Sequence, residues 1–377
     1  MTKTIDNEQK TLNVPNLRFP EFEGEWEKTR LKEISKFSKE RLNSIELSCS
    51  NYVTTENMLQ DYKGIVSATN LPTNTNVVKF SKGDVLLSNI RPYLKKVWYA
   101  DKNGGCSADV FVFKALPICD SNFLHHVIAN DRFIKFVMGG AKGVKMPRGD
   151  KEQMITYKVG LPCIEEQKKI ANLLSLLDER ISTQNKIIED LKKLKSAISD
   201  RLFKNIKGDV ITLSEICDIV KGKQINGEYL TESGEYYVMN GGTEPSGYYG
   251  DYNVDANTIS ISEGGNSCGY VQFNTSPFWS GGHCYSIQNI ADNIDNLYLY
   301  HYLKSKEDAI MKLRIGSGLP NIQKKDLAMF KIEIPTIKQQ KTISTFLSSL
   351  ERKAEIEERI QNAMLKEKQF LLRQMFI

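Results

Sequence analysis

Apolar residues recur at alternating spacings of four and three along two long stretches of this chain. In the first stretch eight of ten such positions are apolar, and the series reads Ile170, Leu174, Leu177, Ile181, Gln184, Ile188, Leu191, Lys195, Ile198 and Leu202. In the second, seven of ten are apolar, and the series reads Ile343, Leu347, Leu350, Ala354, Glu357, Gln361, Met364, Lys368, Leu371 and Met375. An apolar repeat of 3.5 residues held over this length is typical of a coiled-coil seam.

Each stretch predicts a helix of about 38 residues, which at 1.5 Å per residue is a rod of roughly 55–60 Å. A helix with one apolar stripe is not stable alone in water, so we expect the two helices to pair with each other. Antiparallel pairing within the chain is the simplest arrangement, because a whole globular segment separates the helices in sequence. It would place the two globular segments at opposite ends of the pair. The alternative is two unrelated surface helices, each packed on its own domain.

The polar residues within the seam, such as Gln184 and Lys368, are expected to set the register of the helix pair at some cost in stability. Outside the helices, alternating apolar stretches bounded by Gly, Asn and Asp predict β-strands. Residues 121–138 and 295–313 carry apolar residues at helical spacing behind an Asp, Ser or Asn cap and predict further helices. The fold class is therefore α+β.

The whole pattern occurs twice. Residues 143–203 align without a gap with residues 316–376 at an offset of 173, and sixteen of the 61 pairs are identical. Residues 85–113 align with 259–287 at an offset of 174. A repeat of this length implies two domain-sized units rather than a solenoid. The expected domains are a flexible N-terminus (1–16), a first recognition unit (17–160), a first helical spacer (161–205), a second unit (206–333) and a second spacer (334–377).

Composition limits the classes of protein to consider. The chain has 377 residues, 40% of them hydrophobic and 26% charged, as in a soluble globular protein. It has no apolar run of membrane-spanning length and no apolar N-terminal leader. Seven scattered cysteines without CxxC spacing favour the reducing cytoplasm. A net charge of +5 permits a polyanionic partner without requiring one.

The sequence offers no catalytic motif. It has no GxxxxGK[ST] phosphate loop and no HExxH zinc pair. None of its eleven prolines is followed by Asp or Pro, which removes a common nuclease signature and the Pro-Pro-aromatic motif of amino-methyltransferases. The four histidines lack ligand spacing, so no metal site and no catalytic residue is predicted. Any chemistry is expected to belong to another chain.

The arrangement of unit, helix, unit, helix resembles the specificity subunit of type I restriction–modification systems. The phrases that carry the resemblance are LRFPEFEGEWE, GDVLLSNIRPYLKKV, LPCIEEQKKIANLLSLLDERI and IPTIKQQKTISTFLSSL. A Pro-x-x-x-x-Gln-x-x-Ile phrase occurs at the same place in both repeats, as Pro162–Ile170 and Pro335–Ile343. The resemblance covers the chain from residue 17 to its last residue.

This resemblance implies a non-catalytic, DNA-binding subunit of a phage-defence system, with two target recognition domains separated by antiparallel helical spacers. It implies a bipartite target, in which two specific half-sites flank a nonspecific gap set by the spacers. The implied partners are double-stranded DNA, two modification subunits that methylate adenine, and restriction subunits that cleave DNA. S-adenosylmethionine, ATP and Mg²⁺ are expected on those partners and not on this chain.

Loops between the repeated strands, and loops before the last strand of each unit, are the expected DNA-contact regions, because base reading needs forked polar groups and phosphates need charge. The candidates are Arg91, Tyr93, Lys95, Lys96, Lys142, Lys145, Arg148, Lys221, Lys223, Ser262, Asn266, Arg314, Asn321, Gln323 and Lys324. The alternative is that these are ordinary surface loops that diverge because nothing restrains them.

Two other functions remain open from the sequence. The first is a coiled-coil scaffold with protein-binding ends, which would lack the steep salt dependence of DNA binding. The second is a stand-alone nuclease or methyltransferase, which would be active as a purified chain.

Overall fold

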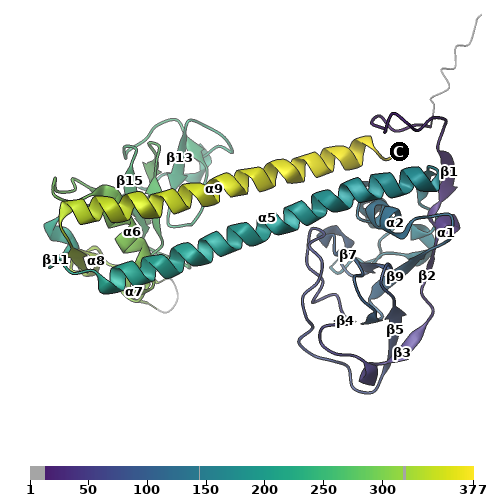
Figure 1. The fold of residues 1–377 in the computed structure, drawn as a ribbon. Coiled ribbons are helices and arrows are strands. Elements are labelled where there is room, and N and C mark those ends of the chain that lie inside the picture. Colours follow the sequence, from purple (N-terminus) through teal and green to yellow (C-terminus); the bar gives the residue numbers. More distant parts are fainter. Residues whose placement is uncertain (1–12, 144, 317–319) are drawn as a thin grey trace, which may run out of the picture. The chain divides into compact units, whose positions relative to one another are not determined.

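The computed structural model describes residues 13–143, 145–316 and 320–377. The predicted flexible N-terminus therefore lies mostly outside the described residues. The chain divides into two compact units, unit 1 (up to residue 184, with 360–377) and unit 2 (185–359). Each unit contains sheets, short helices and part of each of two long helices, α5 (Ile164–Asn205) and α9 (Ile337–Gln374) (Figure 1). The predicted α+β class and tandem repeat are confirmed.

The described residues of unit 1 form three sheets. Two strands, β1 and β10, pair antiparallel, with Glu27 opposite Leu161. A four-stranded sheet has the order β2-β9-β6-β7, and a second has the order β3-β5-β8-β4. The bounds are β1 (Glu27–Arg30), β2 (Ser35–Phe37), β3 (Arg41–Asn43), β4 (Tyr52–Val53), β5 (Asn76–Phe80), β6 (Val85–Ser88), β7 (Val97–Tyr99), β8 (Gly104–Cys106), β9 (Val110–Ala115) and β10 (Lys158–Leu161).

Unit 2 repeats two of these sheets. Strand β11 pairs with β19 as β1 does with β10, and the order β12-β18-β15-β16 corresponds to β2-β9-β6-β7. The remaining sheet, β14-β13-β17, has a different order and strand number, so this is where the two units diverge. The bounds are β11 (Asp209–Thr212), β12 (Asp218–Lys221), β13 (Tyr236–Met239), β14 (Tyr248–Tyr249), β15 (Thr258–Ser262), β16 (Val271–Asn274), β17 (Trp279–Ser280), β18 (Cys284–Gln288) and β19 (Lys331–Ile334).

The predicted helices at 121–138 and 295–313 are each broken in two. In unit 1 the side chain of Asn130 accepts a hydrogen bond from the backbone N–H of Arg132, which caps a new helix within the apolar run. A corresponding break follows Ser305 in unit 2. The short helices are α1 (Leu31–Ile34), α2 (Ser121–Ile128), α3 (Asp131–Gly139), α4 (Lys151–Met154), α6 (Asn296–Ser305), α7 (Glu307–Met311) and α8 (Lys324–Ala328).

The repeated glutamine anchors the start of each long helix to its unit. In unit 1, Gln167 Oε1 accepts from the N–H of Asp120 (2.8 Å), while Nε2 donates to the carbonyls of Pro162 (2.9 Å) and Ile118 (3.1 Å). Gln340 makes the same three bonds in unit 2, at 2.8, 2.9 and 3.2 Å. Both side chains are buried. The glutamine of the Pro-x-x-x-x-Gln phrase thus makes three buried hydrogen bonds that fix the start of each long helix.

A buried histidine forms a second repeated contact. His126 Nε2 lies 3.4 Å from Ser175 Oγ in unit 1, and His301 Nε2 lies 2.9 Å from Ser348 Oγ in unit 2. Burial holds the pKa of His126 well below its usual value and lowers the pKa of His301 to about 4. Both histidines are therefore neutral parts of the packing between a short helix and the start of a long one.

The far end of each long helix packs in the unit built from the other repeat. Phe376, just after α9, stacks on Phe123 of α2 in unit 1. Phe203, near the end of α5, packs edge-on against Tyr298 and Tyr302 of α6 in unit 2. Each unit therefore holds the start of one long helix and the end of the other, and within each unit the helices run antiparallel.

Ion pairs show the register of this pairing. In unit 1, Lys368 Nζ lies 2.5 Å from Asp178 Oδ1, and in unit 2 Lys195 pairs with Glu351. Lys195 and Lys368 are equivalent in the repeat, as are Asp178 and Glu351, so one contact is made twice. These lysines lie within the seam, where polar residues are expected to set the register.

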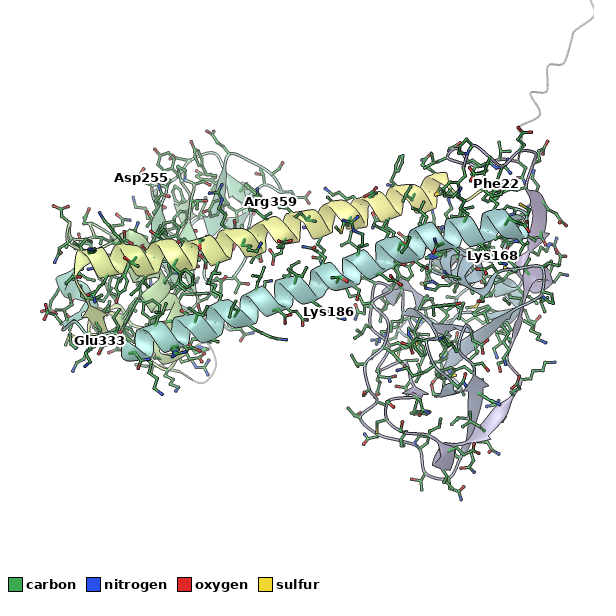
Figure 2. All side chains as sticks on the ribbon, viewed as in Figure 1. Phe22, Lys168, Lys186, Asp255, Glu333 and Arg359 are labelled. Atoms are coloured by element: carbon green, nitrogen blue, oxygen red, sulfur yellow. The ribbon has the colours of Figure 1, made fainter. Side chains whose placement is uncertain are left out.

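The predicted pairing residues of the seam are all buried or half-buried. The buried ones are Ile170, Leu174, Ile181, Ile188, Leu347 and Met375, and the half-buried ones are Leu177, Leu191, Ile198, Leu202, Ile343, Leu350, Met364 and Leu371. Many positions outside the seam are solvent-exposed, among them Lys168, Lys186 and Arg359 (Figure 2). The two halves of each long helix thus present their apolar stripe to the other helix or to the unit's core.

Candidate nucleic-acid interface

Two of the predicted DNA-contact loops of unit 1 are hydrogen-bonded to each other. The N–H of Arg91 donates to the carbonyl of Pro147 (2.8 Å), and the N–H of Gly149 donates to the carbonyl of Asn89 (3.2 Å). Lys142 and Arg148 exchange two backbone bonds of 2.9 Å, which close the second loop on itself. A third segment joins them, because the N–H of Asn89 donates to the carbonyl of Asp109 (2.8 Å). We call these residues, 89–91, 109, 142 and 147–149, junction 1.

Unit 2 builds the same junction from equivalent residues. The N–H of Gly265 donates to the carbonyl of Pro320 (3.0 Å), and the N–H of Ile322 to that of Glu263 (2.8 Å). Ile315 and Asn321 exchange two bonds of 2.8 and 3.0 Å, and the N–H of Glu263 donates to the carbonyl of His283 (2.9 Å). Junction 2 therefore consists of residues 263–265, 283, 315 and 320–322.

The two junctions share their backbone and differ in their side chains. Every hydrogen bond just described in junction 1 has its counterpart in junction 2 at an offset of 173 or 174. Only the proline is kept, as Pro147 and Pro320. The pairs that differ are Asn89 and Glu263, Ile90 and Gly264, Arg91 and Gly265, Asp109 and His283, Lys142 and Ile315, Arg148 and Asn321, and Gly149 and Ile322. Main-chain hydrogen bonds thus fix the backbone of both junctions, and this backbone accommodates different side chains.

Two basic residues of unit 1 occupy a strained backbone conformation. Arg91 has φ 50° and Lys95 has φ 54°, both in the left-handed region. The equivalent residues of unit 2 are Gly265 and Gly269, with φ +76° and +89°. A side chain in this conformation costs about 1–2 kcal/mol, which glycine avoids. Unit 1 therefore keeps a guanidinium and an ammonium at positions where the fold alone favours glycine, which is common at functional sites.

Three lysine candidates of unit 1 contact an acidic or a carbonyl group. Lys95 Nζ lies 2.9 Å from Asp131 Oδ1, Lys142 Nζ lies 2.5 Å from Asp150 Oδ2, and Lys96 Nζ donates to the carbonyl of Thr55 (2.6 Å). The Lys142 side chain is 82% exposed, so solvent screens its pair with Asp150 strongly. Tyr93 and Lys145 are exposed on the same loops. The ion pairs of Lys95 and Lys142 are screened by solvent and contribute little stability.

In unit 2 the candidates divide into exposed and buried groups. The exposed candidates are Lys221, Lys223, Asn266, Arg314, Asn321, Gln323 and Lys324. Ser262 is buried, and its hydroxyl donates to the carbonyl of Gly241 (2.6 Å). Its equivalent, Ser88, donates to the carbonyl of Ile90 (3.0 Å), so this serine forms part of the loop frame. Lys221 Nζ lies 2.6 Å from Oε1 of the buried Glu263, which places strand β12 beside junction 2.

The structure adds Asn89, Asp109 and His283 to the candidates found from sequence. Their signal was present in the 174-residue offset, because Asp109 and His283 align just before the repeated strands β9 and β18. It was missed because neither residue lies in a basic loop. A search for side chains that differ at matched positions would have found them.

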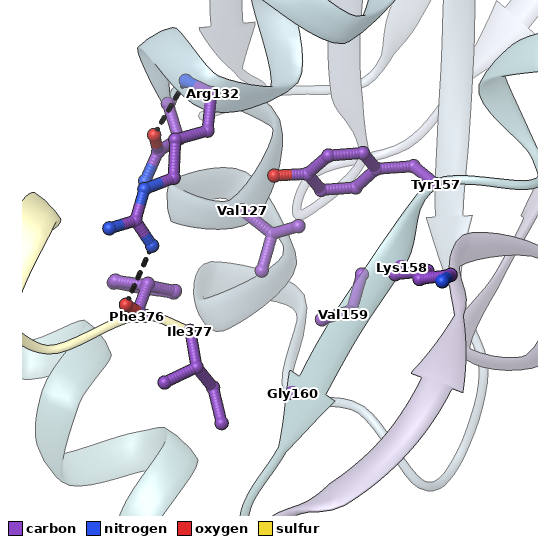
Figure 3. Close-up of a pocket in the computed structure, with 9 residues that line it drawn as sticks. Val127, Arg132, Tyr157, Lys158, Val159, Gly160, Phe376 and Ile377 are labelled. Atoms are coloured by element: carbon purple, nitrogen blue, oxygen red, sulfur yellow. Dashed lines mark hydrogen bonds between the residues drawn. The ribbon is translucent and has the colours of Figure 1, made fainter. Parts of the chain in front are cut away.

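A cavity in unit 1 is too small for a ligand. It has a volume of about 10 Å³, near what one water molecule needs. Arg132 borders it and donates to the carbonyl of Phe376 (2.9 Å) (Figure 3). It also donates to the carbonyl of Arg373 (3.1 Å). The guanidinium thus satisfies one carbonyl in the last turn of α9 and one just after the helix.

Comparison with known proteins identifies the family. The model of the type I restriction modification DNA specificity domain matches residues 23–193 and again residues 205–366. The chain belongs to this family. Each match runs from just before the first strand of a repeat into its long helix, so the chain carries two specificity domains in tandem.

Individual relatives are similar over part or all of the chain. Putative type I specificity subunits of Mycoplasma genitalium and Mycoplasma pneumoniae are 32% and 34% identical over 41% and 38% of this chain. These alignments span only 42% and 39% of the relatives' own lengths. The type I restriction enzyme MjaVIII specificity subunit of Methanocaldococcus jannaschii is 25% identical over 97% of this chain and 94% of its own.

Solved structures confirm the fold of the specificity domain tandem. A type I restriction–modification S subunit from Mycoplasma genitalium matches with a TM-score of 0.70 at 19% identity, covering 97% of this chain and 99% of its own. A chain from a structure on complex assembly and conformational transition of a type I system matches with a TM-score of 0.56 at 19% identity, covering 92% and 96%. Among the described residues, no helix is long and apolar enough to cross a membrane.

Proposed function

We propose that this chain reads DNA sequence for a type I restriction–modification complex, with each unit recognising one half of a bipartite target. The observation that carries the proposal is the pair of junctions with one backbone and two sets of side chains. Phosphates are alike at every site, whereas base edges differ from site to site. A protein that reads two different half-sites therefore needs a constant frame with variable side chains.

The charges around the junctions suit a polyanion. Arg91, Lys95, Lys145, Lys223 and Lys324 lie on or beside the junction loops, and each phosphate that such a residue neutralises releases counterions. The ion pairs with Asp131 and Asp150 are partly or fully exposed, so little free energy is lost when phosphates replace the carboxylates. Affinity for duplex DNA is expected to fall steeply as salt rises.

The long helices would set the nonspecific gap. Each contributes one half to each unit, and the pairing is antiparallel in both. Helices of 42 and 38 residues correspond to rods of roughly 57–63 Å. We propose that their length fixes the number of base pairs between the half-sites, since two-fold proteins read half-sites at a fixed spacing on the duplex.

The chemistry would belong to partner chains. We propose that two modification subunits methylate adenine and that restriction subunits cleave DNA, while this chain selects the site and is not itself an enzyme. Family membership supports this division of labour. A complex that acts on chromosomal and phage DNA would work in the cytoplasm, as the seven free cysteines also suggest.

Selection from a random duplex library tests the proposal. The chain, alone and with its modification subunits, would be incubated with the library at 50 and 200 mM salt, and the retained DNA sequenced. The expected result is two short motifs at a fixed spacing, with retention that falls by orders of magnitude over this salt range. Retention without a motif, or binding that salt does not weaken, would favour a scaffold instead.

A further inference from the structure

We propose that positions 109 and 148 of junction 1, and the equivalent positions 283 and 321 of junction 2, hold the side chains that discriminate bases. The neighbouring lysines would contact phosphates. This inference rests on the proposed function and deepens it, because it assigns sequence reading to four named residues, two of which carry no positive charge at any pH.

The backbone fixes where these side chains start. Position 109 accepts a main-chain hydrogen bond from position 89, and position 283 accepts one from position 263. Arg148 and Asn321 are each held by two main-chain bonds to the opposite side of their own loop. The backbone that carries these side chains is therefore held by the same hydrogen bonds in both junctions, and little ordering is left to be done when DNA binds.

Each position is accessible, and across each junction an acid faces a base. In junction 1, Arg148 Nη2 lies 3.5 Å from Asp109 Oδ1, and these side chains are 54% and 41% exposed. In junction 2, the His283 side chain is 63% exposed and its Nδ1 lies 3.8 Å from Oε2 of Glu263. Asn321 is exposed. Because these side chains are exposed, each can give up its contact within the protein and bind a base edge instead.

The chemistry differs between the junctions in the way that base reading requires. The Arg148 guanidinium offers the forked donors that match O6 and N7 of guanine, and the Asp109 carboxylate accepts from the amino group of cytosine. The Asn321 amide matches N6 and N7 of adenine, and the His283 imidazole offers one donor and one acceptor. Two half-sites of different sequence follow from these differences alone.

Each junction contains a buried acceptor without a hydrogen-bond donor in the described part of the chain, at one equivalent position. Asn89 Oδ1 and Glu263 Oε2 are buried, and neither has a hydrogen-bond partner among the described residues. Glu263 is only 6% exposed, and its other oxygen accepts from Lys221 (2.6 Å) and Tyr285 (3.1 Å). A buried acceptor without a donor costs free energy. Its recurrence at matched positions points to a donor supplied on DNA binding, either by a base or by a reading side chain that turns.

Exchange of one reading residue tests the inference. The variant Arg148→Asn carries the side chain that junction 2 uses, and Arg41→Asn, an exposed arginine on β3 of unit 1, is the matched control. Each protein is put through the library selection described above. Arg148→Asn is expected to change the preferred base at one position of one half-site and to lower discrimination there roughly 5- to 150-fold. The other half-site and the gap should stay the same, and the control should select the wild-type motif.

A second variant keeps the test independent of how Arg148→Asn folds. His283→Gln changes an exposed side chain of unit 2 and should alter the other half-site only. Lys145→Ala, by contrast, should weaken binding about equally for all sequences. If both reading variants lower affinity uniformly and leave the motif unchanged, the assignment is overturned while the proposed function stands. If the wild-type protein itself selects no bipartite motif, the proposed function fails.

Discussion

Phe376 stacks on Phe123 with ring centroids 5.3 Å apart and an interplanar angle of 23°. One ring follows the last helix of the chain, and the other belongs to α2 of unit 1. Phe203 makes the equivalent contact with Tyr298 in unit 2, at 5.8 Å. Each unit is therefore completed by the helix end that the other repeat supplies, which ties both halves of the chain to one antiparallel pairing.

This contact predicts a large effect of a substitution at the end of the chain. Phe376→Ala should lower the free energy of unfolding of unit 1 by about 3–5 kcal/mol, because Phe376 is 7% exposed in the core of that unit. Phe370→Ala, at a 51% exposed position within α9, should change it by less than about 0.5 kcal/mol. Chemical denaturation with hydrogen exchange of α2 measures both. Equal effects of the two variants would show that the contact does not stabilise unit 1.

The buried histidines predict a loss of stability in mild acid. His301 has a folded pKa of about 4 because of burial, and an unfolded value near 6.5. As the pH falls from about 6.5 to 4, His301 takes up a proton in the unfolded chain but stays neutral in the folded chain. Folding stability therefore declines over this pH range. The slope approaches about 1.4 kcal/mol per pH unit for each such histidine, and His126 adds to it.

Denaturant titrations at pH 7, 6 and 5 measure this slope. His301→Gln keeps a hydrogen-bonding group beside Ser348 but cannot take up the proton. The slope of its unfolding free energy against pH should therefore be smaller than that of the wild-type protein by the contribution of one proton. A variant with the wild-type slope would show that His301 is not the group that titrates.

The strained arginine predicts that stability and DNA affinity separate. Arg91→Gly removes a side chain from a residue with φ 50°, where unit 2 has Gly265. The free energy of unfolding should stay unchanged or rise by about 1 kcal/mol, because glycine tolerates this backbone. Affinity for DNA should fall, and the salt slope should shrink by about one unit if Arg91 contacts a phosphate.

Arg91→Lys is the matched control, since it keeps the charge and the strain. It should bind DNA with nearly the wild-type salt slope. Loss of stability in Arg91→Gly without loss of affinity would mean that the arginine serves the fold instead.

Much of the architecture could be predicted from sequence because it is encoded by patterns that are long and repeated. The seam extends over ten positions in each of α5 and α9. The phrases that contain Gln167 and Gln340 mark the start of a long helix in both repeats. The third sheet of each unit could not be predicted, because strands such as β14 (Tyr248–Tyr249) and β17 (Trp279–Ser280) are too short to show a period. The break between α2 and α3 was also missed, since the Asn130 cap lies within an otherwise continuous apolar pattern.

The candidate site was located only in part for a physical reason. Basic loops stand out in a sequence, so Arg91 and Arg148 were found. The contacts that bring Asn89, Asp109 and Arg148 together are main-chain hydrogen bonds, which any side chain permits. Sequence therefore indicates the loops but not their convergence into a junction.

Lengthening the helix pair tests the central claim most directly. One heptad would be inserted into α5 between Gln184 and Asn185 and another into α9 between Arg359 and Ile360, which keeps the apolar seam in register. Seven residues add about 10.5 Å, or about three base-pair steps of 3.4 Å. Library selection should then return both original half-sites with the gap widened by about three base pairs. An unchanged gap, with both half-sites still selected, would contradict the account.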